Sequence, residues 1–320
     1  MSPDWRPNLA HGVLATRADL MARTRAFFAR RGVLEVQTPI LGHAGTSDPQ
    51  IESLHTRLSD RPDPWYLHTS PESAMKRLLA AGSGDIYQLC KVFRNGEIGR
   101  WHEPEFSLLE WYRLGFDDQA LMGEVTELLT ELLPARMVGE PECLTYRQAV
   151  LRHAGVDIDQ AGNEDLKGAA HAAGIDCPSE LDRDAILDLL MSLAVGPGLG
   201  HGRAVYVCDY PASQAALARL KPGQPPVAAR FELYLAGLEI ANGFHELASA
   251  GEQRLRFERD LEVRRKRGLP VPPLDERLLA ALSIGLPDCA GVALGFDRLV
   301  AVALEADSLA PAMPFRIDDA

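Results

Sequence analysis

Apolar residues recur at helical spacing in several stretches of the chain. A helix is predicted over residues 18–31, and Gly32 after it is a stop signal. One face of this helix would carry Leu20, Met21, Thr24, Phe27 and Phe28. A second helix is expected over residues 70–82, because Ser70-Pro71-Glu72 offers a cap, a first-turn proline and an acid at the positive end of the dipole. Further helices are expected over residues 117–133 and 252–267 and from Asp297 onward.

Runs rich in β-branched and aromatic residues predict strands between these helices. The first run covers residues 33–41 and ends near Pro39, which has no N–H to give to a sheet. The others cover residues 86–93, 106–112, 204–208, 228–242 and 291–294. Helices and strands occur in blocks rather than in strict alternation. This favours an α+β fold, with an antiparallel or mixed β-sheet flanked by helices.

Composition narrows the class of protein. The 320 residues are 46% hydrophobic, which is enough for a large core, and the net charge is −12. Such an excess of carboxylates argues against a general nucleic-acid binder, which must neutralise phosphates. The five cysteines are scattered without a C-x-x-C pair, so we expect reduced thiols and no zinc site. No signal peptide or membrane span is expected, and the predicted location is the cytoplasm.

Residues 92–112 carry the most informative chemistry. They read as two strands joined by a polar loop, with Arg94 at the end of the first strand. The planar fork of an arginine can bind a phosphate and a carboxylate at once. The alternative is an arginine in an ordinary surface salt bridge.

Two acids in a later strand pattern form a second candidate site. Glu232 and Glu239 are an odd number of residues apart, so one continuous strand would place them on opposite faces. A two-residue turn at Ala236-Gly237 would instead pair Glu232 with position 241 and bring Glu239 to the same face. Mg²⁺ bound to ATP phosphates would relieve their repulsion. The alternative is an exposed acidic strand face.

Three motifs in order resemble those of class II aminoacyl-tRNA synthetases in their lysyl form. Phe-Arg-x-x-Glu with His-x-Pro-Glu-Phe and Leu-Glu-Trp-Tyr, within residues 93–112, is similar to motif 2. The helix and strand ending at Pro39 resemble motif 1, and residues 291–298 resemble motif 3. The resemblance implies an N-terminal extension at 1–16 and a catalytic domain at 17–320. We interpret residues 140–200 as a helical insertion.

The resemblance also implies roles for individual residues. Arg94 and Arg298 are the expected catalytic residues, and Glu232 and Glu239 the expected Mg²⁺ ligands. The expected ATP-binding residues are Arg94, Asn95, Gly96, Glu97, Glu103, Phe106, Glu239, Ile240, Gly295 and Arg298. The residues expected to bind a diamino acid are Ser70, Pro71, Glu72, Tyr112, Asn242, Glu246 and Ala293.

Three positions depart from the lysyl pattern. Asn95 is followed by Gly96 and then Glu97, so the acid after the arginine is displaced by one residue. Glu103 follows His102 where lysyl enzymes have asparagine, and Ala293 replaces a common glycine. One added methyl group at position 293 is worth about 1–3 kcal/mol of selectivity, which biases against α-lysine.

The chain most resembles a stand-alone branch of this family, the elongation factor P–lysine ligases. The motif 1 helix begins near residue 17, so no OB-fold anticodon-binding domain is expected, and tRNA is not expected as an acceptor. Residues 69–79, 211–215 and 241–247 resemble that branch closely. The resemblance implies ATP-dependent activation of lysine or (R)-β-lysine as an adenylate, with ATP and Mg²⁺ as cofactors. Transfer to a lysine ε-amine of elongation factor P and a homodimer formed through motif 1 are also implied.

Two other functions remain open. One is a truncated lysyl-tRNA synthetase-like enzyme that acts on tRNA or a free amine, and the other is a non-catalytic regulatory paralogue. A paralogue of that kind typically loses phosphate-binding arginines or metal acids, whereas this chain keeps both. The basic helix over residues 252–267 could dock an acidic partner, or it is a solvated helix face.

Overall fold

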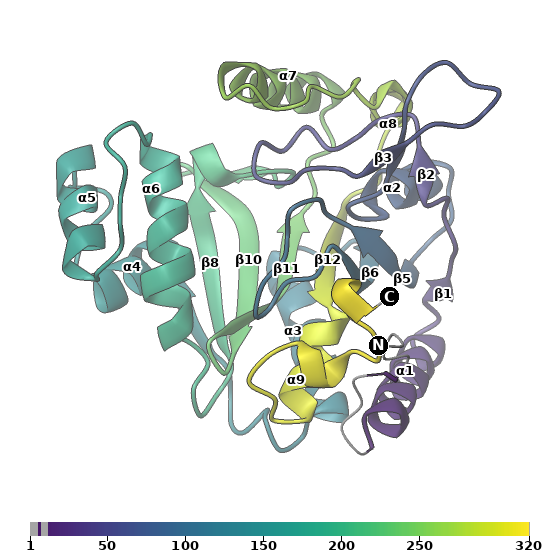
Figure 1. Cartoon of the computed structure of the whole chain (residues 1–320), viewed down its shortest axis with the longest axis horizontal. Coiled ribbons are helices and arrows are strands. Elements are labelled where there is room, and N and C mark those ends of the chain that lie inside the picture. The colour runs from purple at the N-terminus through teal and green to yellow at the C-terminus, as the bar shows by residue number, and fades with distance from the viewer. Residues whose placement is uncertain (1–5, 8–11, 320) are drawn as a thin grey trace, which may run out of the picture. The chain divides into compact units, whose positions relative to one another are not determined.

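The structure is a computed structural model that describes residues 6–7 and 12–319 (Figure 1). The chain divides into two compact units, which are described separately. Unit 1 contains the residues up to Phe116 and those from Leu247 onward, and unit 2 is Asp117–Glu246. The extension predicted at 1–16 lies for the most part outside the described residues, which omit 1–5 and 8–11.

Unit 1 is built on a mixed sheet in the order β1-β5-β6-β12. Strand β1 pairs parallel with β5, whereas β5–β6 and β6–β12 are antiparallel. The strands are β1 (Leu34–Glu35), β5 (Ile86–Phe93), β6 (Glu105–Leu114) and β12 (Cys289–Gly295), with a small sheet of β2 (Leu41–Gly42), β3 (His55–Thr56) and β4 (Trp65–Leu67). The helices are α1 (Val13–Arg30), α2 (Glu72–Ala80), α7 (Ala250–Lys266), α8 (Glu276–Ile284) and α9 (Phe296–Ala303), followed by the short turns η4 (Ala310–Ala312) and η5 (Ile317–Asp319).

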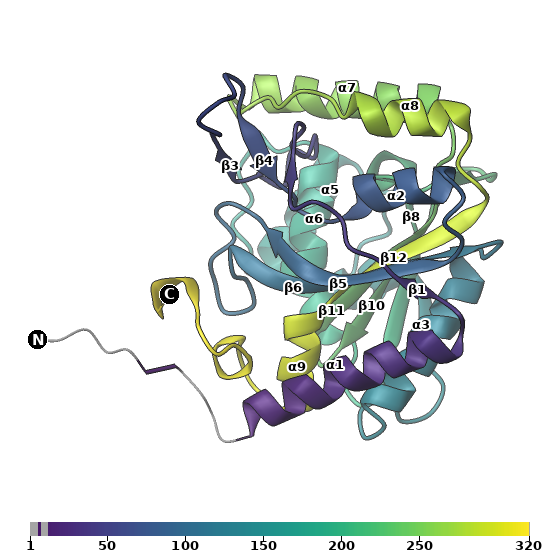
Figure 2. The same cartoon turned by 90° about the vertical axis from the view of Figure 1, so that its right-hand side faces the viewer.

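Strand β6 is covered on both faces of the sheet (Figure 2). On the face toward α1, the ring of Phe28 stacks on Tyr87 at 4.4 Å between centroids and meets Trp111 edge-on at 5.3 Å. On the other face, α2 and α8 pack over the sheet in an apolar cluster that contains Met75, Tyr112 and other buried side chains. Because residues 107–112 of β6 are buried, each polar side chain among them needs a partner inside the protein.

A buried carboxylate joins three elements of unit 1. Asp297, in the first turn of α9, accepts from the Arg17 guanidinium at 2.5 Å and from the Ser107 backbone N–H at 2.6 Å. The same guanidinium donates to Ser107 Oγ at 2.7 Å. Asp297 is 2% exposed, and this network therefore fixes α1 and α9 against β6.

The strand predicted over residues 33–41 is wrong as a single strand. The chain is extended there, but its hydrogen bonds change partner along the way. Val36 N donates to the Tyr87 carbonyl at 2.9 Å, whereas the Ile40 carbonyl accepts from His68 N at 2.9 Å. Pro39 lies between these contacts and has no N–H, so the segment crosses from one sheet to the other instead of continuing one ladder.

Helix α7 holds the loop between β2 and β3. Arg264 is 2% exposed, and its guanidinium donates to the backbone carbonyls of Asp48 at 2.7 Å and Ile51 at 2.9 Å. One turn earlier, Asp260 accepts from Ser47 Oγ at 3.3 Å. This charged helix therefore has a buried side with a packing role.

Three basic residues of α7 that reach the surface are paired with acids. Arg254 donates to Glu276, Arg256 to Glu252 and Arg265 to Glu262. Exposed pairs of this kind contribute little stability. They favour the interpretation of α7 as a solvated helix face over that of a basic docking surface.

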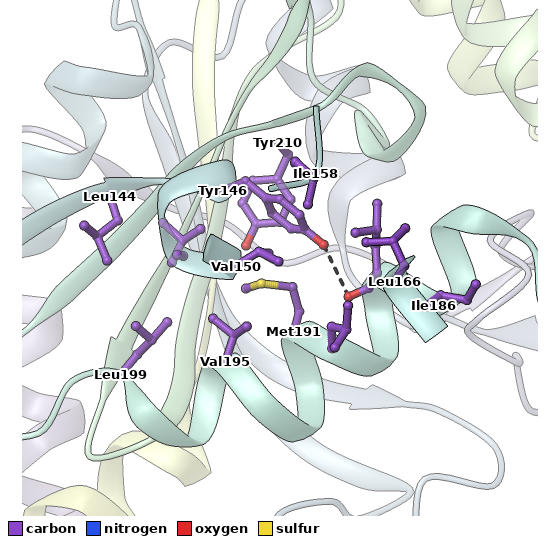
Figure 3. Close-up of a cluster of buried hydrophobic side chains, with 14 of the residues drawn as sticks. Leu144, Tyr146, Val150, Ile158, Leu166, Ile186, Met191, Val195, Leu199 and Tyr210 are labelled. Carbon is purple, nitrogen blue, oxygen red and sulfur yellow. Dashed lines mark hydrogen bonds between the residues drawn. The ribbon is translucent and has the colours of Figure 1, made fainter. Parts of the chain in front are cut away.

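The strands of unit 2 are hydrogen-bonded in the order β11-β10-β8-β7, with β9 paired to β10. Its strands are β7 (Glu142–Thr145), β8 (Val205–Pro211), β9 (Leu220–Lys221), β10 (Val227–Leu235) and β11 (Leu238–His245). Its helices are α3 (Asp118–Leu132), α4 (Tyr146–Ala154), α5 (Asn163–Ala172) and α6 (Arg183–Leu190), with the short turns η1 (Met191–Val195), η2 (Gly196–Gly198) and η3 (Ala212–Gln214). Figure 3 shows the apolar cluster in which α4, α5 and α6 meet β8, with the Tyr146 hydroxyl donating to the Leu187 carbonyl at 3.3 Å.

The hairpin of β10 and β11 confirms the predicted turn but not the predicted register. Ala236 and Gly237 have φ of 52° and 78°, as a type I′ turn requires. Glu232 lies opposite Asn242 rather than position 241, because a β-bulge interrupts the ladder between Leu233 and Tyr234. A bulge adds one residue to one strand and shifts every later pair. Glu239 lies opposite Tyr234 and so shares the face of Glu232, as expected.

Most helix predictions are confirmed to within a few residues. The Asp117 carboxylate accepts from Ala120 N at 2.8 Å and caps α3, and α2 ends two residues before Gly82. Helix α1 begins at Val13, one turn earlier than its apolar pattern indicates. Within the described residues, no helix is long and apolar enough to cross a bilayer.

A pH-dependent stability follows from Asp260. Burial, followed by the negative charge of Asp48, raises the pKa of Asp260 to about 7. The unfolded carboxyl has a pKa of about 3.9, so the folded state binds more protons between about pH 4 and 7, and stability falls as pH rises through that window. After allowance for solvent screening, we expect Asp260→Asn to raise the free energy of unfolding at pH 8 by about 1–2 kcal/mol.

Urea unfolding at pH 4 and pH 8 measures this effect. The gain should be largely lost at pH 4, where Asp260 is protonated in the folded state and about half protonated in the unfolded state. Asp60→Asn is the matched control, because its carboxylate is 76% exposed and should give no pH-dependent difference. An equal gain at both pH values would contradict the assignment to Asp260.

Candidate active site

One face of β6 carries a buried carboxylate among small neighbours. Side chains alternate along a strand, so Glu110 shares its face with Leu108 and Tyr112. In the adjacent β12, the residues opposite Glu110 and Tyr112 are Ala293 and Gly291. Small side chains in β12 therefore flank the acid on this side.

Glu110 is 2% exposed, and two hydroxyl groups hold its carboxylate. Ser70 Oγ donates to Oε2 at 2.7 Å, and the Tyr112 hydroxyl donates to Oε1 at 2.7 Å. Neither donor carries a positive charge. A carboxylate accepts several hydrogen bonds, so the chemistry of Glu110 suits a cationic group as a further donor.

The start of α2 brings a second acid to this cluster. Ser70 Oγ also accepts from the Glu72 backbone N–H at 3.0 Å, although the helix begins one residue later than predicted, at Glu72, with Pro71 rather than Ser70 in the N-cap position. The Glu72 carboxylate accepts from Lys76 Nζ at 2.5 Å. Lys76 is 1% exposed, which is rare for a lysine and indicates that the ion pair positions Glu72.

Gln88 lies opposite Glu110 in the β5–β6 ladder and is 3% exposed. Its Oε1 atom is buried and has no hydrogen-bond partner among residues 6–7 and 12–319. An unsatisfied buried acceptor costs about 1–3 kcal/mol, and a donor such as a substrate ammonium group would satisfy it. Gln88 is thus a further polar group beside the carboxylate.

Arg94 follows β5 and lies half-buried at the start of the loop to β6. Its Nε donates weakly to the Thr69 carbonyl at 3.5 Å, and its guanidinium lies 3.7 Å from Glu97 and 5.0 Å from the Phe106 ring centroid. Asn95 next to it donates to Glu52 Oε1 at 2.9 Å. Gly96 has φ of 75°, a conformation that favours glycine, and this turn directs Glu97 back toward Arg94.

Arg298 lies in the first turn of α9, and it contacts the same loop. Its Nη2 lies 2.8 Å from His102 Nε2, and its Nε lies 3.4 Å from the Trp101 carbonyl. Partial burial, followed by the positive charge of Arg298, lowers the pKa of His102. A neutral His102 can accept from Arg298, and so the loop brings both arginines to one place.

Glu103 has a different environment from the one that its predicted ATP-binding role suggests. It is 1% exposed, and its carboxylate accepts from the Arg316 guanidinium and from Ile317 N, the latter at 3.2 Å. Both partners belong to the segment after α9. Its oxygens are thus engaged within the protein, which favours a structural role over direct contact with ATP.

In unit 2, Glu232 is 7% exposed and has two donors. Arg230 donates to Oε1 and the Tyr234 hydroxyl to Oε2, the latter at 2.7 Å. Burial and the charges of Glu232 and Glu239 raise the pKa of Tyr234 well above its ordinary value, so its hydroxyl remains a donor. The charge of Glu239 also acts on Arg230, which places both acids around one guanidinium.

The other predicted residues of unit 2 occupy the same hairpin and its end. Asn242 Oδ1 accepts from Arg230 Nε at 3.3 Å, and Ile240 is a buried apolar residue. Glu246 is 1% exposed and pairs with Ala218 in a short antiparallel bridge. Arg230 therefore connects Asn242 and Glu232.

Both carboxylates fit a magnesium ion in type and placement. Glu232 and Glu239 share one face of the hairpin, and carboxylate oxygens are the ligands that Mg²⁺ prefers. Each oxygen of Glu232 retains a second lone pair beyond its hydrogen bond. These two acids would hold the ion, together with phosphate oxygens of a nucleotide.

The sequence reasoning missed several residues of the site. Glu110 and His102 fall inside the recognised motif, but neither was assigned a role. A lone acid between apolar residues of a strand that is buried on both faces was the available signal for Glu110. Lys76 has a weaker signal, since it lies four residues after Glu72 in a helix. The contact of Arg230 with Asn242 depends on the register of the β10–β11 hairpin, which the bulge changes from the predicted one.

The buried Lys76–Glu72 pair gives a stability prediction. Lys76→Met removes the cation and leaves a partly buried carboxylate, so we expect the free energy of unfolding to fall by about 3 kcal/mol. Lys91→Met is the matched control, because the Lys91–Glu105 pair is about half exposed and should contribute less than about 0.5 kcal/mol. Urea unfolding measures both, and equal losses would contradict the role of burial.

Comparison with known proteins agrees with these motifs. The family model for class II tRNA synthetases (D, K and N) matches residues 3–318. The chain is 47% identical to the elongation factor P–(R)-β-lysine ligase of Salmonella typhi, over 99% of this chain and 98% of that protein. The ligases of the same name from Salmonella dublin and Salmonella paratyphi B are 46% identical over the same shares. The chain therefore belongs to the class II tRNA synthetase family, as its three motifs predict.

Proposed function

We propose that this chain activates (R)-β-lysine with ATP and transfers it to the ε-amine of a lysine on elongation factor P. The names of its full-length relatives support this activity. The observation that carries the proposal is the buried Glu110 carboxylate, held by Ser70 and Tyr112 near the start of α2. A cationic amino acid is the ligand that such a site favours.

The amino groups of the substrate account for the acids of unit 1. A diamine brings two positive charges, and Glu110 and Glu72 supply two negative ones. Gln88 Oε1 adds a neutral acceptor beside Glu110. Ala293, which lies opposite Glu110, adds a methyl group where the lysyl pattern has glycine. A methyl group there biases selection toward the β-amino acid by about 1–3 kcal/mol.

The two arginines account for the anionic groups. Arg94 would bind the substrate carboxylate and the α-phosphate, and Arg298 the γ-phosphate, because a guanidinium offers several donors to oxyanions. Glu232 and Glu239 would hold Mg²⁺ with the phosphates. When bound, that ion supplies charge neutralisation. We assign Glu103 to the support of the loop rather than to the nucleotide itself.

The proposed reaction has two steps, activation of the amino acid and its transfer to the acceptor amine. The amino-acid carboxylate attacks the α-phosphate, forming an aminoacyl-adenylate and releasing pyrophosphate. The ε-amine of elongation factor P then attacks the acyl carbonyl, forming an amide and releasing AMP and a proton. Positioning and charge stabilisation by the arginines are the protein's contribution in the first step, and no covalent enzyme intermediate is needed.

The finer parts of the proposal concern assembly and location. Helix α1 and the segment after it, which resemble motif 1, would form a homodimer interface. Leu14 and Leu34 are 54% and 58% exposed there, and such residues are common at interfaces. We also propose that the protein acts in the cytoplasm, where its acceptor is made.

Mass spectrometry of the acceptor tests the function. Incubation with ATP, Mg²⁺, (R)-β-lysine and elongation factor P should add one β-lysyl group to the factor. Arg94→Ala should lower kcat/KM for ATP–pyrophosphate exchange at least ~100-fold, equivalent to about 2.7 kcal/mol of transition-state stabilisation. An unmodified factor alongside aminoacylated tRNA would instead support a synthetase-like activity. Absence of pyrophosphate exchange with every lysine isomer would support a regulatory paralogue.

The role of Glu110 predicts a change that is confined to the amino acid. Glu110→Gln keeps the size of the side chain but removes its charge, so an ammonium group loses a charge-assisted hydrogen bond. We expect KM for (R)-β-lysine to rise by about tenfold or more, while KM for ATP changes less than twofold.

Glu105→Gln is the matched control on the same strand, because the Glu105 carboxylate is half exposed and pairs with Lys91. Kinetics of pyrophosphate exchange, measured with each substrate varied in turn, separate the two variants. Equal changes in both KM values for Glu110→Gln would point to a folding defect instead of a substrate contact.

A further inference from the structure

The segment that follows α9 crosses back over the loop between β5 and β6. Here this segment, residues 307–317, is called the strap. Its contacts with the loop come from both backbone and side chains: Leu309 N donates to the Arg100 carbonyl at 2.9 Å, and Arg100 Nε donates to the Asp307 carbonyl. Figure 2 shows the yellow strap beside this blue loop. The strap is thus bonded to the loop that carries motif 2.

The strap itself is anchored in the protein interior. Leu309, Ala312 and Met313 are 2%, 0% and 4% exposed. Removal of these apolar side chains from water stabilises their position. A segment fixed in this way can hold a loop that has few apolar residues of its own.

An ion pair between a part-buried arginine and a buried carboxylate also joins strap and loop. The Arg316 guanidinium donates to Glu103, whose second oxygen accepts from Ile317 N at 3.2 Å. Arg316 also lies 3.5 Å from the Gly99 carbonyl. Glu103 is 1% exposed, so its charge would be costly without this partner. The position is also one where the chain departs from the lysyl pattern.

Glu103 lies between two loop residues that each contact one of the arginines. His102, on one side, lies 2.8 Å from Arg298 Nη2. Pro104, on the other, accepts from the backbone N–H of Arg94 at 2.8 Å. A displacement of Glu103 by even one ångström would therefore move the groups that orient both arginines.

We propose that Arg316 is a positioning residue for nucleotide binding, which acts through Glu103 to hold the motif 2 loop. The proposal rests on the proposed function, in which Arg94 and Arg298 bind ATP. Arg316 needs no contact with the nucleotide. Its effect on the reaction comes from the geometry of residues 99–104.

A double-mutant cycle tests this role. Arg316→Gln leaves a buried carboxylate without its cation, so Glu103 should leave its site and the loop should move. We expect ATP affinity by calorimetry to fall at least fivefold and amide hydrogen exchange in residues 99–104 to accelerate at least tenfold. KM for the amino acid should change less than twofold. Glu103→Gln combined with Arg316→Gln removes the uncompensated charge, and most of the loss should be recovered.

Arg265→Gln is the matched control, because it breaks an exposed arginine–glutamate pair in the same unit and should leave all three quantities unchanged. An unchanged rate of amide hydrogen exchange in the loop of Arg316→Gln would overturn the proposal. A double variant whose loss of ATP affinity equals the sum of the losses in the two single variants would also overturn it. Amide hydrogen exchange in residues 99–104 measures the effect of the contact between strap and loop even if the parent protein fails to bind ATP. A failure of the proposed function is therefore distinguishable from a failure of the strap.

Discussion

The burial of β6 on both faces of the sheet is the constraint that determines how the polar groups of unit 1 are paired. A strand in that position cannot leave a polar group unmatched, since water does not reach it. Asp297 meets this requirement on one face by accepting from the Ser107 backbone and from Arg17. On the opposite face, Glu110 meets it through Ser70 and Tyr112. The first set fixes the helices, and the second surrounds a carboxylate, a group whose chemistry suits a cationic ligand.

Regular elements could be predicted from the sequence because their signals are local. The strand over residues 86–93 and the cap at Asp117 need only the residues of their own segments. The prediction of one strand over residues 33–41 is wrong because the backbone hydrogen bonds of this segment go to two different sheets. No local sequence pattern reveals that change of partner. Likewise, the register of the β10–β11 hairpin depends on a bulge, whose position is set by packing on both sides of the strand.

The candidate site was predictable to the extent that its residues belong to motifs. Arg94 and Arg298 approach one loop, and Ser70, Glu72 and Tyr112 lie around Glu110, as the resemblance implies. Supporting residues such as Lys76 and Arg316 were not predictable, because a paired cation and a solvated one have the same sequence pattern. Their pairing requires knowledge of which segments meet, and for Arg316 the partner lies more than two hundred residues away.

The two faces of β6 have different roles, and this difference affects how the substrate specificity of such an enzyme can change during evolution. Residues that fix α1 and α9 and residues of the proposed substrate site alternate along β6 and face opposite sides. Under the proposed function, exchange of Ala293 in β12 or Gln88 in β5, which lie opposite Glu110, would alter the substrate side and leave the side covered by α1 and α9 unchanged. Specificity can thus drift among related amino acids through single substitutions, without an intermediate that fails to fold.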